Sequence, residues 1–328
     1  MTAGGQDAAR SSPPALIESV PNFSEGRRPE VIDAIVAAVR ASGAASILDA
    51  SSDTDHNRSV LTLAGAPGVV RAAVLALVDA CVARIDLRSH HGGHPRLGAV
   101  DVIPLVPIRG VGMQDCIVLA RDIGATIAAH HDLPVYLYEK AATAPHRRNL
   151  ADIRKGEFEG FPEKIKDPLW KPDFGPDRVH PTAGCVAVGA REFLIAYNIN
   201  LATADLGLAK SIARLIRESS GGLPCVKAMG VMLQDRGIAQ VSINMTDFRT
   251  TPLHVVFEKV REEAARHGVE VSGSEIVGLV PSDALIETAG LFLKLEGFDA
   301  SKVLERRLEQ AYASGGEDPA GSRDRRER

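Results

Sequence analysis

The alternation of apolar and polar residues divides most of the chain into strands and helices. In the first half, one apolar stripe at helical spacing runs over residues 29–41, and a longer, nearly all-apolar helix is predicted over 66–87. The segments with strand-like patterns are residues 15–20, 45–50, 59–65 and 99–108. Their order is βαββαβ, the split unit of ferredoxin-like folds. A helix over 113–131, a strand over 134–139 and a short helix around Asn149–Lys155 extend this unit.

The same order returns after Gly184. A strand over 193–202 and a helix over 205–222 precede a hairpin with its turn at Gln234–Gly237. A helix over 252–268 and a strand over 269–279 close the second unit. We therefore expect an α/β (α+β) fold of two ferredoxin-like βαββαβ subdomains, with helices packed on the sheets and a ligand cleft between them. The predicted boundaries are 15–192 and 193–314, with disordered ends at 1–14 and 315–328.

Composition narrows the class of protein. The chain has 328 residues, 45% hydrophobic and 24% charged, which is typical of a globular protein. Its net charge of −4 and its lack of a basic run interleaved with aromatics argue against nucleic acid as a partner. The first fourteen residues lack the apolar core of a signal peptide, so we expect a cytoplasmic protein and no membrane association. The cysteines are widely spaced, as in a reducing compartment, at Cys81, Cys116, Cys185 and Cys225.

A histidine-rich loop, SHHGGHPRLG, stands immediately before the apolar strand at 99–108. Glycines and Pro95 exclude a helix there, so His90 and His94 do not form an i, i+4 pair of metal ligands, and we predict no metal site. Imidazole titrates in the range that suits general acid/base catalysis, and paired glycines let a ligand approach the backbone. His94 is the favoured acid/base because Pro95 stiffens the chain after it. The alternative is an ordinary polar surface loop.

Other polar segments allow both structural and functional interpretations. DASSDTDHNRS resembles a calcium loop, but Arg58 replaces the required glycine and Ala64 the distal glutamate. In that segment Asn57 and Arg58 are either turn residues or donors to an anionic ligand. VPNFSEGR, which contains Asn22, is similarly ambiguous, and the proline-rich segment 159–184 could be a rigid connector. No glycine-rich phosphate loop follows a strand, so the common nucleotide-binding motifs are absent.

Seven of these segments together resemble the glutamate formimidoyltransferases. The shared motifs are VPNFSEGR, DHNRSV, HHGGHPRLGAVDVIPLVPIRGV, PVYLYEKAA, WKPDFGP, GAREFLIAYNINL and VSINMTDF. They span roughly Leu16 to Gly297 and include long runs. The chain is similar to the stand-alone bacterial form, without the cyclodeaminase domain of mammalian members. Some members have a bulky aromatic residue in place of Ala183 and an aspartate in place of Ser51.

The resemblance implies an enzyme that transfers the formimidoyl group from N-formimidoyl-L-glutamate to N5 of tetrahydrofolate. The products are L-glutamate and 5-formimidoyltetrahydrofolate, a late step of histidine degradation. Tetrahydrofolate is the implied co-substrate, a homodimer the implied assembly, and His94 matches the family's catalytic histidine. The folate-contacting loop falls on Gly175, Pro176, Asp177, Arg178, Val179, His180, Pro181, Thr182, Ala183 and Gly184.

Substrate carboxylates need partners, and arginine forks suit them. Arg58, Arg96 and Arg178 are candidates, with Asn22 and Asn57 as further substrate-binding residues. Three alternatives stay open. The donor could be N-formyl-L-glutamate, since a carbonyl differs from an iminium by one atom and one charge. The chain could instead bind folate without catalysis, or it could be a binding module for unrelated acidic metabolites.

Overall fold

The structure is a computed structural model that describes residues 14–43 and 45–313. Apart from Pro14, the ends predicted to be disordered, 1–14 and 315–328, lie outside the described residues. The chain divides into two compact units, the first ending at Glu192 and the second beginning at Phe193. Among the described residues, no helix combines the length and the apolar character needed to cross a bilayer.

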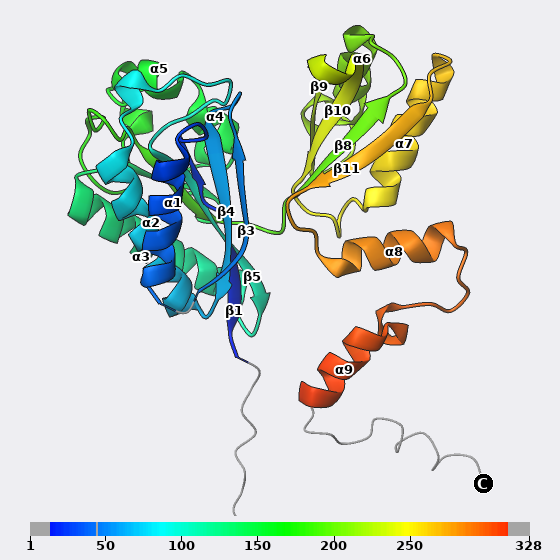
Figure 1. The fold of residues 1–328 in the computed structure, drawn as a ribbon, viewed down its shortest axis with the longest axis horizontal. Helices are drawn as coiled ribbons and strands as arrows, with labels where there is room; N and C mark the ends of the chain where they lie inside the picture. The colour runs from blue at the N-terminus through cyan, green and yellow to red at the C-terminus, as the bar shows by residue number, and fades with distance from the viewer. Residues whose placement is uncertain (1–13, 44, 314–328) are drawn as a thin grey trace, which may run out of the picture. The chain divides into compact units, whose positions relative to one another are not determined.

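The first unit contains a mixed sheet built around the strand that follows the histidine loop (Figure 1). Its strands are β1 (Leu16–Ser19), β2 (Asn22–Phe23), β3 (Ser46–Asp53), β4 (Arg58–Gly65), β5 (Val100–Arg109), β6 (Val135–Glu139) and β7 (Val186–Ala190). β1 lies between β5 and β4, β3 pairs with the outer side of β4, and all these neighbours are antiparallel. This is the strand order of a ferredoxin-like sheet. β7 and β6 extend it beyond β5 by parallel pairing.

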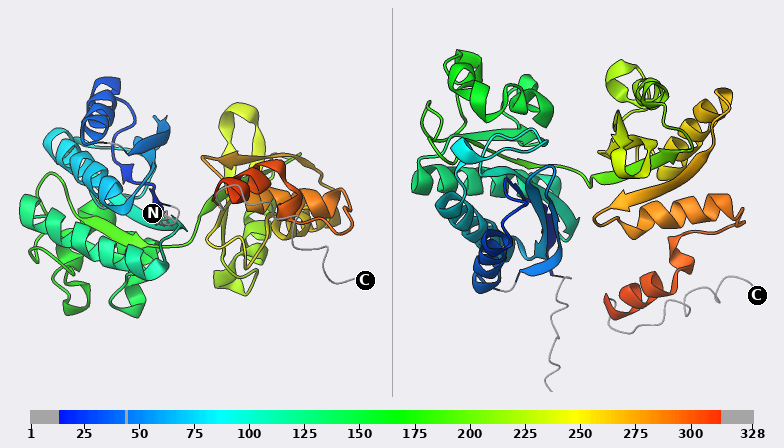
Figure 2. Two further views of the ribbon diagram at one scale, coloured as in Figure 1. Left: turned by 90° about the horizontal axis from the view of Figure 1, so that it is seen from below. Right: turned by 45° about the horizontal axis from the view of Figure 1, so that its top comes forward.

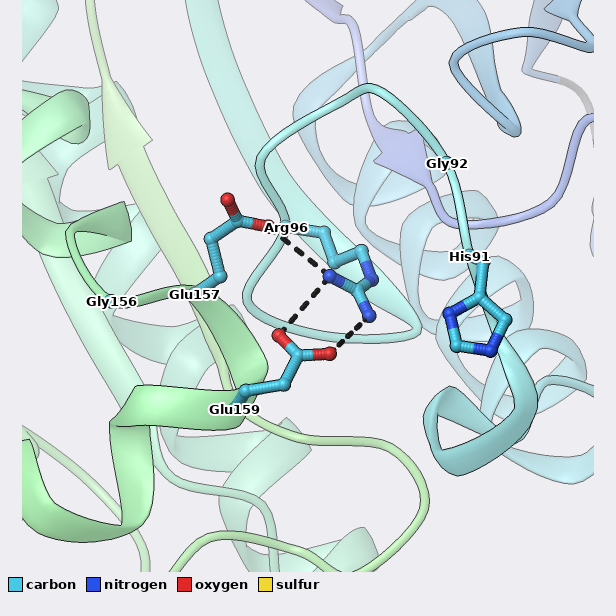
Figure 3. A pocket seen from close by; sticks show the side chains of 6 residues that line it. All are labelled: His91, Gly92, Arg96, Gly156, Glu157 and Glu159. Carbon is cyan, nitrogen blue, oxygen red and sulfur yellow. Dashed lines mark hydrogen bonds and ion pairs between the residues drawn. The ribbon is translucent and has the colours of Figure 1, made fainter.

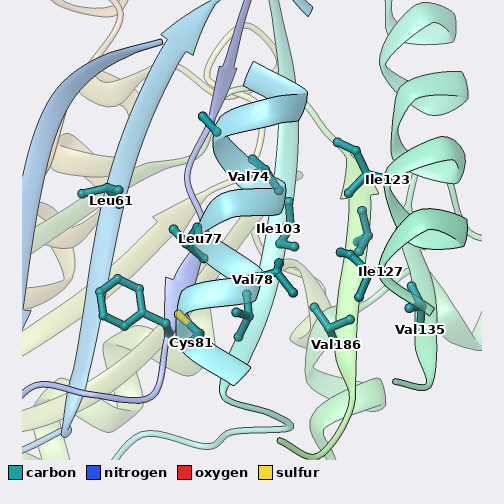
Figure 4. Packing of buried hydrophobic residues seen from close by; sticks show 14 of the residues in the cluster. Leu61, Val74, Leu77, Val78, Cys81, Ile103, Ile123, Ile127, Val135 and Val186 are labelled. Carbon is teal, nitrogen blue, oxygen red and sulfur yellow. The ribbon is translucent and has the colours of Figure 1, made fainter. Parts of the chain in front are cut away.

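Helices cover both faces of this sheet. The helices on one face are α1 (Pro29–Ala41), α2 (Pro67–Arg84) and α3 (Met113–His131). Their apolar side chains form the main core with the sheet, and Figure 4 shows Leu77 and Ile127 pointing toward the strands. Two shorter helices, α4 (Leu150–Arg154) and α5 (Glu157–Lys164), cover the opposite face through a second cluster that includes Tyr136. The histidine loop is thus attached to a strand that is buried on both sides.

The second unit repeats the arrangement on a smaller scale (Figures 1 and 2). Its strands are β8 (Ile195–Leu201), β9 (Val226–Leu233), β10 (Ile238–Met245) and β11 (Val271–Val277), in the antiparallel order β11-β8-β10-β9. Helices α6 (Leu206–Ile216) and α7 (Leu253–Arg266) pack their apolar faces on one side of this sheet. They are followed by α8 (Ser282–Phe292) and α9 (Leu304–Ala313). The predicted α/β class with two ferredoxin-like sheets is therefore confirmed.

The sequence pattern was less accurate where strands are polar or short. The segment 51–58, which joins the strands predicted at 45–50 and 59–65 and was expected to be a loop, is half strand, because β3 continues to Asp53 and β4 begins at Arg58. Only residues 54–57 form the turn. The pattern also missed β7, whose small residues carry no alternation, and α5, which has Pro162 in its interior. The segment 159–184 is consequently more than a connector, since α5 packs on the sheet.

Candidate functional site

The histidine loop, residues 90–99, lies against the turn between β3 and β4. After a single 3-10 turn at Leu87–Ser89 the chain has no regular structure until β5. A Cβ atom on Gly92 would lie 2.2 Å from the carbonyl oxygen of His56, so only glycine permits this approach. The next residue, Gly93, donates a backbone hydrogen bond to the Asp55 carbonyl oxygen at 3.1 Å. The loop is thus fixed on the β3–β4 turn by backbone contact.

Asn57 is the buried residue that ties this turn to its neighbours. Its Oδ1 accepts a hydrogen bond from the Gly26 backbone N–H at 2.9 Å, and its Nδ2 donates to the His91 carbonyl oxygen at 3.0 Å. Its own carbonyl oxygen lies 2.8 Å from Nε2 of His90. Asn57 adopts a φ of 49°, a left-handed conformation that asparagine tolerates better than most residues. It therefore connects the β2–α1 segment, the β3–β4 turn and the histidine loop.

Arg96 closes the other end of the loop (Figure 3). Its guanidinium group is buried and donates to the His90 carbonyl oxygen at 3.0 Å and to Oε1 of Glu159 at 2.6 Å. Glu157 accepts a further bond at 3.1 Å. With His91, Gly92 and Gly156, these side chains line a pocket of about 350 Å³. The two terminal nitrogens of Arg96 thus have protein partners, which fits a residue that shapes the loop.

His94 lies part-buried near the middle of the loop. Its ring is edge-on to that of His56, with centroids 6.5 Å apart, and Nδ1 of His56 lies 2.8 Å from Oδ2 of Asp53. Burial, followed by the positive charge of Arg58, lowers the pKa of His94 to about 2. The imidazole is therefore neutral at physiological pH in the ligand-free protein. A neutral imidazole has a free lone pair and can accept a proton.

Charged groups that the sequence analysis missed lie within electrostatic reach of His94. Arg154, at the end of α4, contributes to the lowered pKa of His94 and forms an ion pair with Asp101. The carboxylate of Asp101 is 1% exposed, and its Oδ1 accepts the Leu97 backbone N–H at 2.8 Å. The sequence does contain a signal for Asp101. A single aspartate within the apolar run AVDVIPLVP needs a buried partner. Nothing local in the sequence marked Arg154 as that partner.

The loop 175–184, predicted to contact folate, is joined to the histidine loop by backbone hydrogen bonds. The Ala183 carbonyl oxygen accepts from Ala99 N–H at 2.9 Å, and the Thr182 carbonyl oxygen accepts from Leu87 N–H at 2.8 Å. Within the loop, Nδ1 of His180 accepts the Ala183 backbone N–H at 3.0 Å. The two segments thus lie side by side, although they are far apart in the sequence.

The side chains of two other predicted residues have their partners outside the histidine loop. The side-chain nitrogen of Asn22 donates to the Val20 carbonyl oxygen at 3.0 Å. Arg178 is exposed and forms an ion pair with Asp132 at the end of α3. The structure thus gives both residues local protein partners. No group of three or more possible metal ligands occurs in residues 14–43 and 45–313.

Comparison with known proteins identifies the family to which this chain belongs. A model of the N-terminal subdomain of the formiminotransferase domain matches residues 16–191, and a model of the formiminotransferase domain matches residues 196–308. The chain belongs to the formiminotransferase family. Both matches together cover the two units described above.

Individual members of the formiminotransferase family are similar over nearly the whole chain. A glutamate formimidoyltransferase of Streptococcus pyogenes is 47% identical over 89% of this chain and 98% of its own length. One of Thermoplasma acidophilum is 46% identical over 90% of this chain and 98% of its own. A formimidoyltransferase-cyclodeaminase of Rattus norvegicus is 43% identical, and this chain spans 53% of its length.

Proposed function

We propose that this protein is a glutamate formimidoyltransferase. It transfers the formimidoyl group of N-formimidoyl-L-glutamate to N5 of tetrahydrofolate, giving L-glutamate and 5-formimidoyltetrahydrofolate in histidine degradation. The observation that carries the proposal is 47% identity to the Streptococcus pyogenes glutamate formimidoyltransferase over 98% of that protein. The part-buried His94, near Arg58 and Arg154, supplies an unprotonated imidazole.

His94 serves as general acid/base in this proposal. N5 of tetrahydrofolate attacks the amidine carbon and must lose its proton as the new C–N bond forms. His94 takes this proton and returns it to the glutamate nitrogen as the old C–N bond breaks, so no net proton is gained or lost. The lowered pKa of His94 leaves the ring unprotonated when the substrates arrive, and a substrate carboxylate that offsets the charge of Arg58 would raise this pKa toward the range in which imidazole accepts a proton efficiently. The resulting imidazolium is a strong acid for the second step.

The substrate contacts are part of the proposal. The loop 175–184 is placed beside the histidine loop by its hydrogen bonds, which supports a role in holding folate. Arg58 is the favoured partner of a substrate carboxylate, and Asn22 is kept as a further candidate. Asn57 and Arg96 act through the loop. The amide of Asn57 already binds Gly26 and a loop carbonyl, and the terminal nitrogens of Arg96 bind a loop carbonyl and the glutamates of α5. Residues 15–192 and 193–314 are the two transferase subdomains.

We also propose a homodimer in the cytoplasm. Exposed leucines on each of the last two described helices support the dimer, since their apolar side chains are available to a partner subunit. They are Leu285, Leu291, Leu304 and Leu308. All four cysteines are free thiols, which fits a reducing compartment.

Glutamate release by the purified protein tests the function and the role of His94 together. The donors are N-formimidoyl-L-glutamate and N-formyl-L-glutamate, each with and without tetrahydrofolate. We expect release only from the formimidoyl donor and only with tetrahydrofolate. His94→Gln should lower kcat by about 10² to 10⁴, while His267→Gln, on the exposed end of α7, serves as the matched control. Full activity of a folded His94→Gln protein would refute the assignment of His94.

A further inference from the structure

The guanidinium groups of Arg58 and Arg154 lie near His94, and their positive charges are only partly offset by neighbouring carboxylates. Arg154 binds the buried carboxylate of Asp101. The side chain of Arg58 has no hydrogen bond or ion pair within the described part of the chain, and its Nε is buried. Nε of Arg154 is likewise buried and unpartnered among the described residues. Donors of this kind need an acceptor, because a buried polar group without a hydrogen bond is costly.

The charges around this pair do not cancel. The carboxylate of Asp101 is deeply buried, and it is shared between Leu97 N–H and Arg154. Asp53 also faces Arg58, but its carboxylate is 47% exposed and accepts hydrogen bonds from the backbone N–H and the ring of His56. Burial, followed by repulsion from Arg154, lowers the pKa of Arg58. Two arginines thus face one buried carboxylate and one half-exposed carboxylate that is already hydrogen-bonded, an arrangement that favours the binding of an anion.

We propose that Arg154, together with Arg58, binds the α-carboxylate of the formimidoyl donor. This inference rests on the proposed function and names a substrate contact that sequence motifs do not indicate. Arg154 keeps its ion pair with Asp101, which holds its guanidinium in place. Arg58 supplies the donors that lack a partner in the ligand-free protein.

The chemistry of the substrates selects this carboxylate over the others. The reaction takes place at the amidine carbon and at N5 of tetrahydrofolate, so His94 must lie near both atoms. The carboxylates of tetrahydrofolate are separated from N5 by the p-aminobenzoyl group and cannot reach arginines that act on His94. The γ-carboxylate of the donor lies at the end of a flexible chain. Its α-carboxylate is attached to the carbon that bears the reacting nitrogen, and it therefore stays beside the reaction centre.

Donors that differ only in their carboxylates test the proposal. N-formimidoylglycine keeps the α-carboxylate and lacks the side chain, whereas N-formimidoyl-4-aminobutyrate keeps only the distal carboxylate. We would measure kcat/KM for these two donors and for N-formimidoyl-L-glutamate. The variants are Arg154→Met, Arg154→Lys and, as a matched control, Arg121→Met on the exposed face of α3. Because Arg154→Met leaves Asp101 without its partner, the double variant Arg154→Met/Asp101→Asn is included.

Donor-dependent losses would support the assignment. We expect Arg154→Met to lower kcat/KM about 10- to 100-fold for the two donors with an α-carboxylate, the effect of one charged hydrogen-bonded contact. For N-formimidoyl-4-aminobutyrate the loss should stay below about threefold, so the preference for α-carboxylates collapses. Arg154→Lys should retain part of this preference, and the double variant should behave as Arg154→Met. Arg121→Met should match the wild type with every donor.

Three results would overturn the inference. An equal loss for all three donors would mean that Arg154 acts only on His94 or on the fold, and no loss would mean that it has no role. Tetrahydrofolate binding, measured by calorimetry, must stay within about threefold of wild type in Arg154→Met, since a larger loss would assign the arginine to folate. Failure of the proposed function itself is distinguishable, because the wild type would then release no glutamate, glycine or 4-aminobutyrate from the respective donors.

Discussion

Replacing Asn57 by alanine should destabilise the first unit far more than it weakens substrate binding. The side chain joins three segments through Gly26 N–H and the His91 carbonyl oxygen, and the residue has a φ of 49°. Alanine removes both hydrogen bonds and tolerates this left-handed conformation poorly. The loop that carries His94 would lose its attachment to the β3–β4 turn.

The size of the effect follows from these contacts. Leaving the buried Gly26 N–H unpaired costs about 1–3 kcal/mol, and losing the bond to the His91 carbonyl oxygen costs about 0.5–1.5 kcal/mol. The left-handed conformation adds about 0.5–1 kcal/mol for alanine relative to asparagine. The total of about 2–5.5 kcal/mol is a large part of the stability of a typical domain.

Urea denaturation followed by circular dichroism measures the loss, and kinetics at saturating tetrahydrofolate gives kcat and KM. Asn57→Gly separates the two contributions, because glycine accepts the backbone conformation but lacks the hydrogen bonds. We expect its loss to be smaller than that of the alanine variant by the conformational part. Asn57→Asp keeps the acceptor for Gly26 and should fall nearer to wild type. Unchanged stability of Asn57→Ala with a raised KM would refute this reasoning and make Asn57 a direct substrate contact.

Two further predictions concern pH and backbone packing. Between pH 6.5 and 5 the wild type should lose up to about 2 kcal/mol more unfolding free energy than His94→Gln, because unfolded His94 takes up a proton that the native ring, with its lowered pKa, refuses. Equal acid sensitivity of the two proteins in urea titrations would contradict this. Gly98→Ala should prevent correct folding, because the new Cβ would lie 1.9 Å from the Cys185 carbonyl oxygen. The control Gly68→Ala, in α2, should be tolerated, because a Cβ at that position meets only open space. Thermal melting of both variants checks the contrast, and a native-like Gly98→Ala protein would show that the contact can relax.

The strongest sequence signals were the long periodic ones. The helix predicted over 113–131 has these bounds in the structure, and the hairpin turn at Gln234–Gly237 also lies where it was expected. These patterns succeed because one face of each element is buried over many residues. β7 could not be recognised in this way, because its five residues are all buried and a short buried run shows no periodicity.

The charged surroundings of His94 could be predicted only in part. Asp101 stands out in its apolar run, but its partner Arg154 lies on another element and became visible only after folding. Asn57 illustrates the reverse case. Its position beside Arg58 indicated a ligand contact, whereas the structure shows its amide bound to backbone groups of two other segments. Local sequence does not record which of several polar partners a side chain finds.

The hydrogen bonds between the loop 175–184 and the segment 87–99 have a consequence for folding. They connect parts of the chain that are distant in sequence, so the loop closure that brings them together is entropically costly and tends to be slow. The two loops therefore become neighbours only when the first unit closes as a whole. Partly folded chains would lack this pairing and could not offer a combined surface to folate. If the loop holds folate as proposed, folate binding would stabilise the native state relative to the partly folded states.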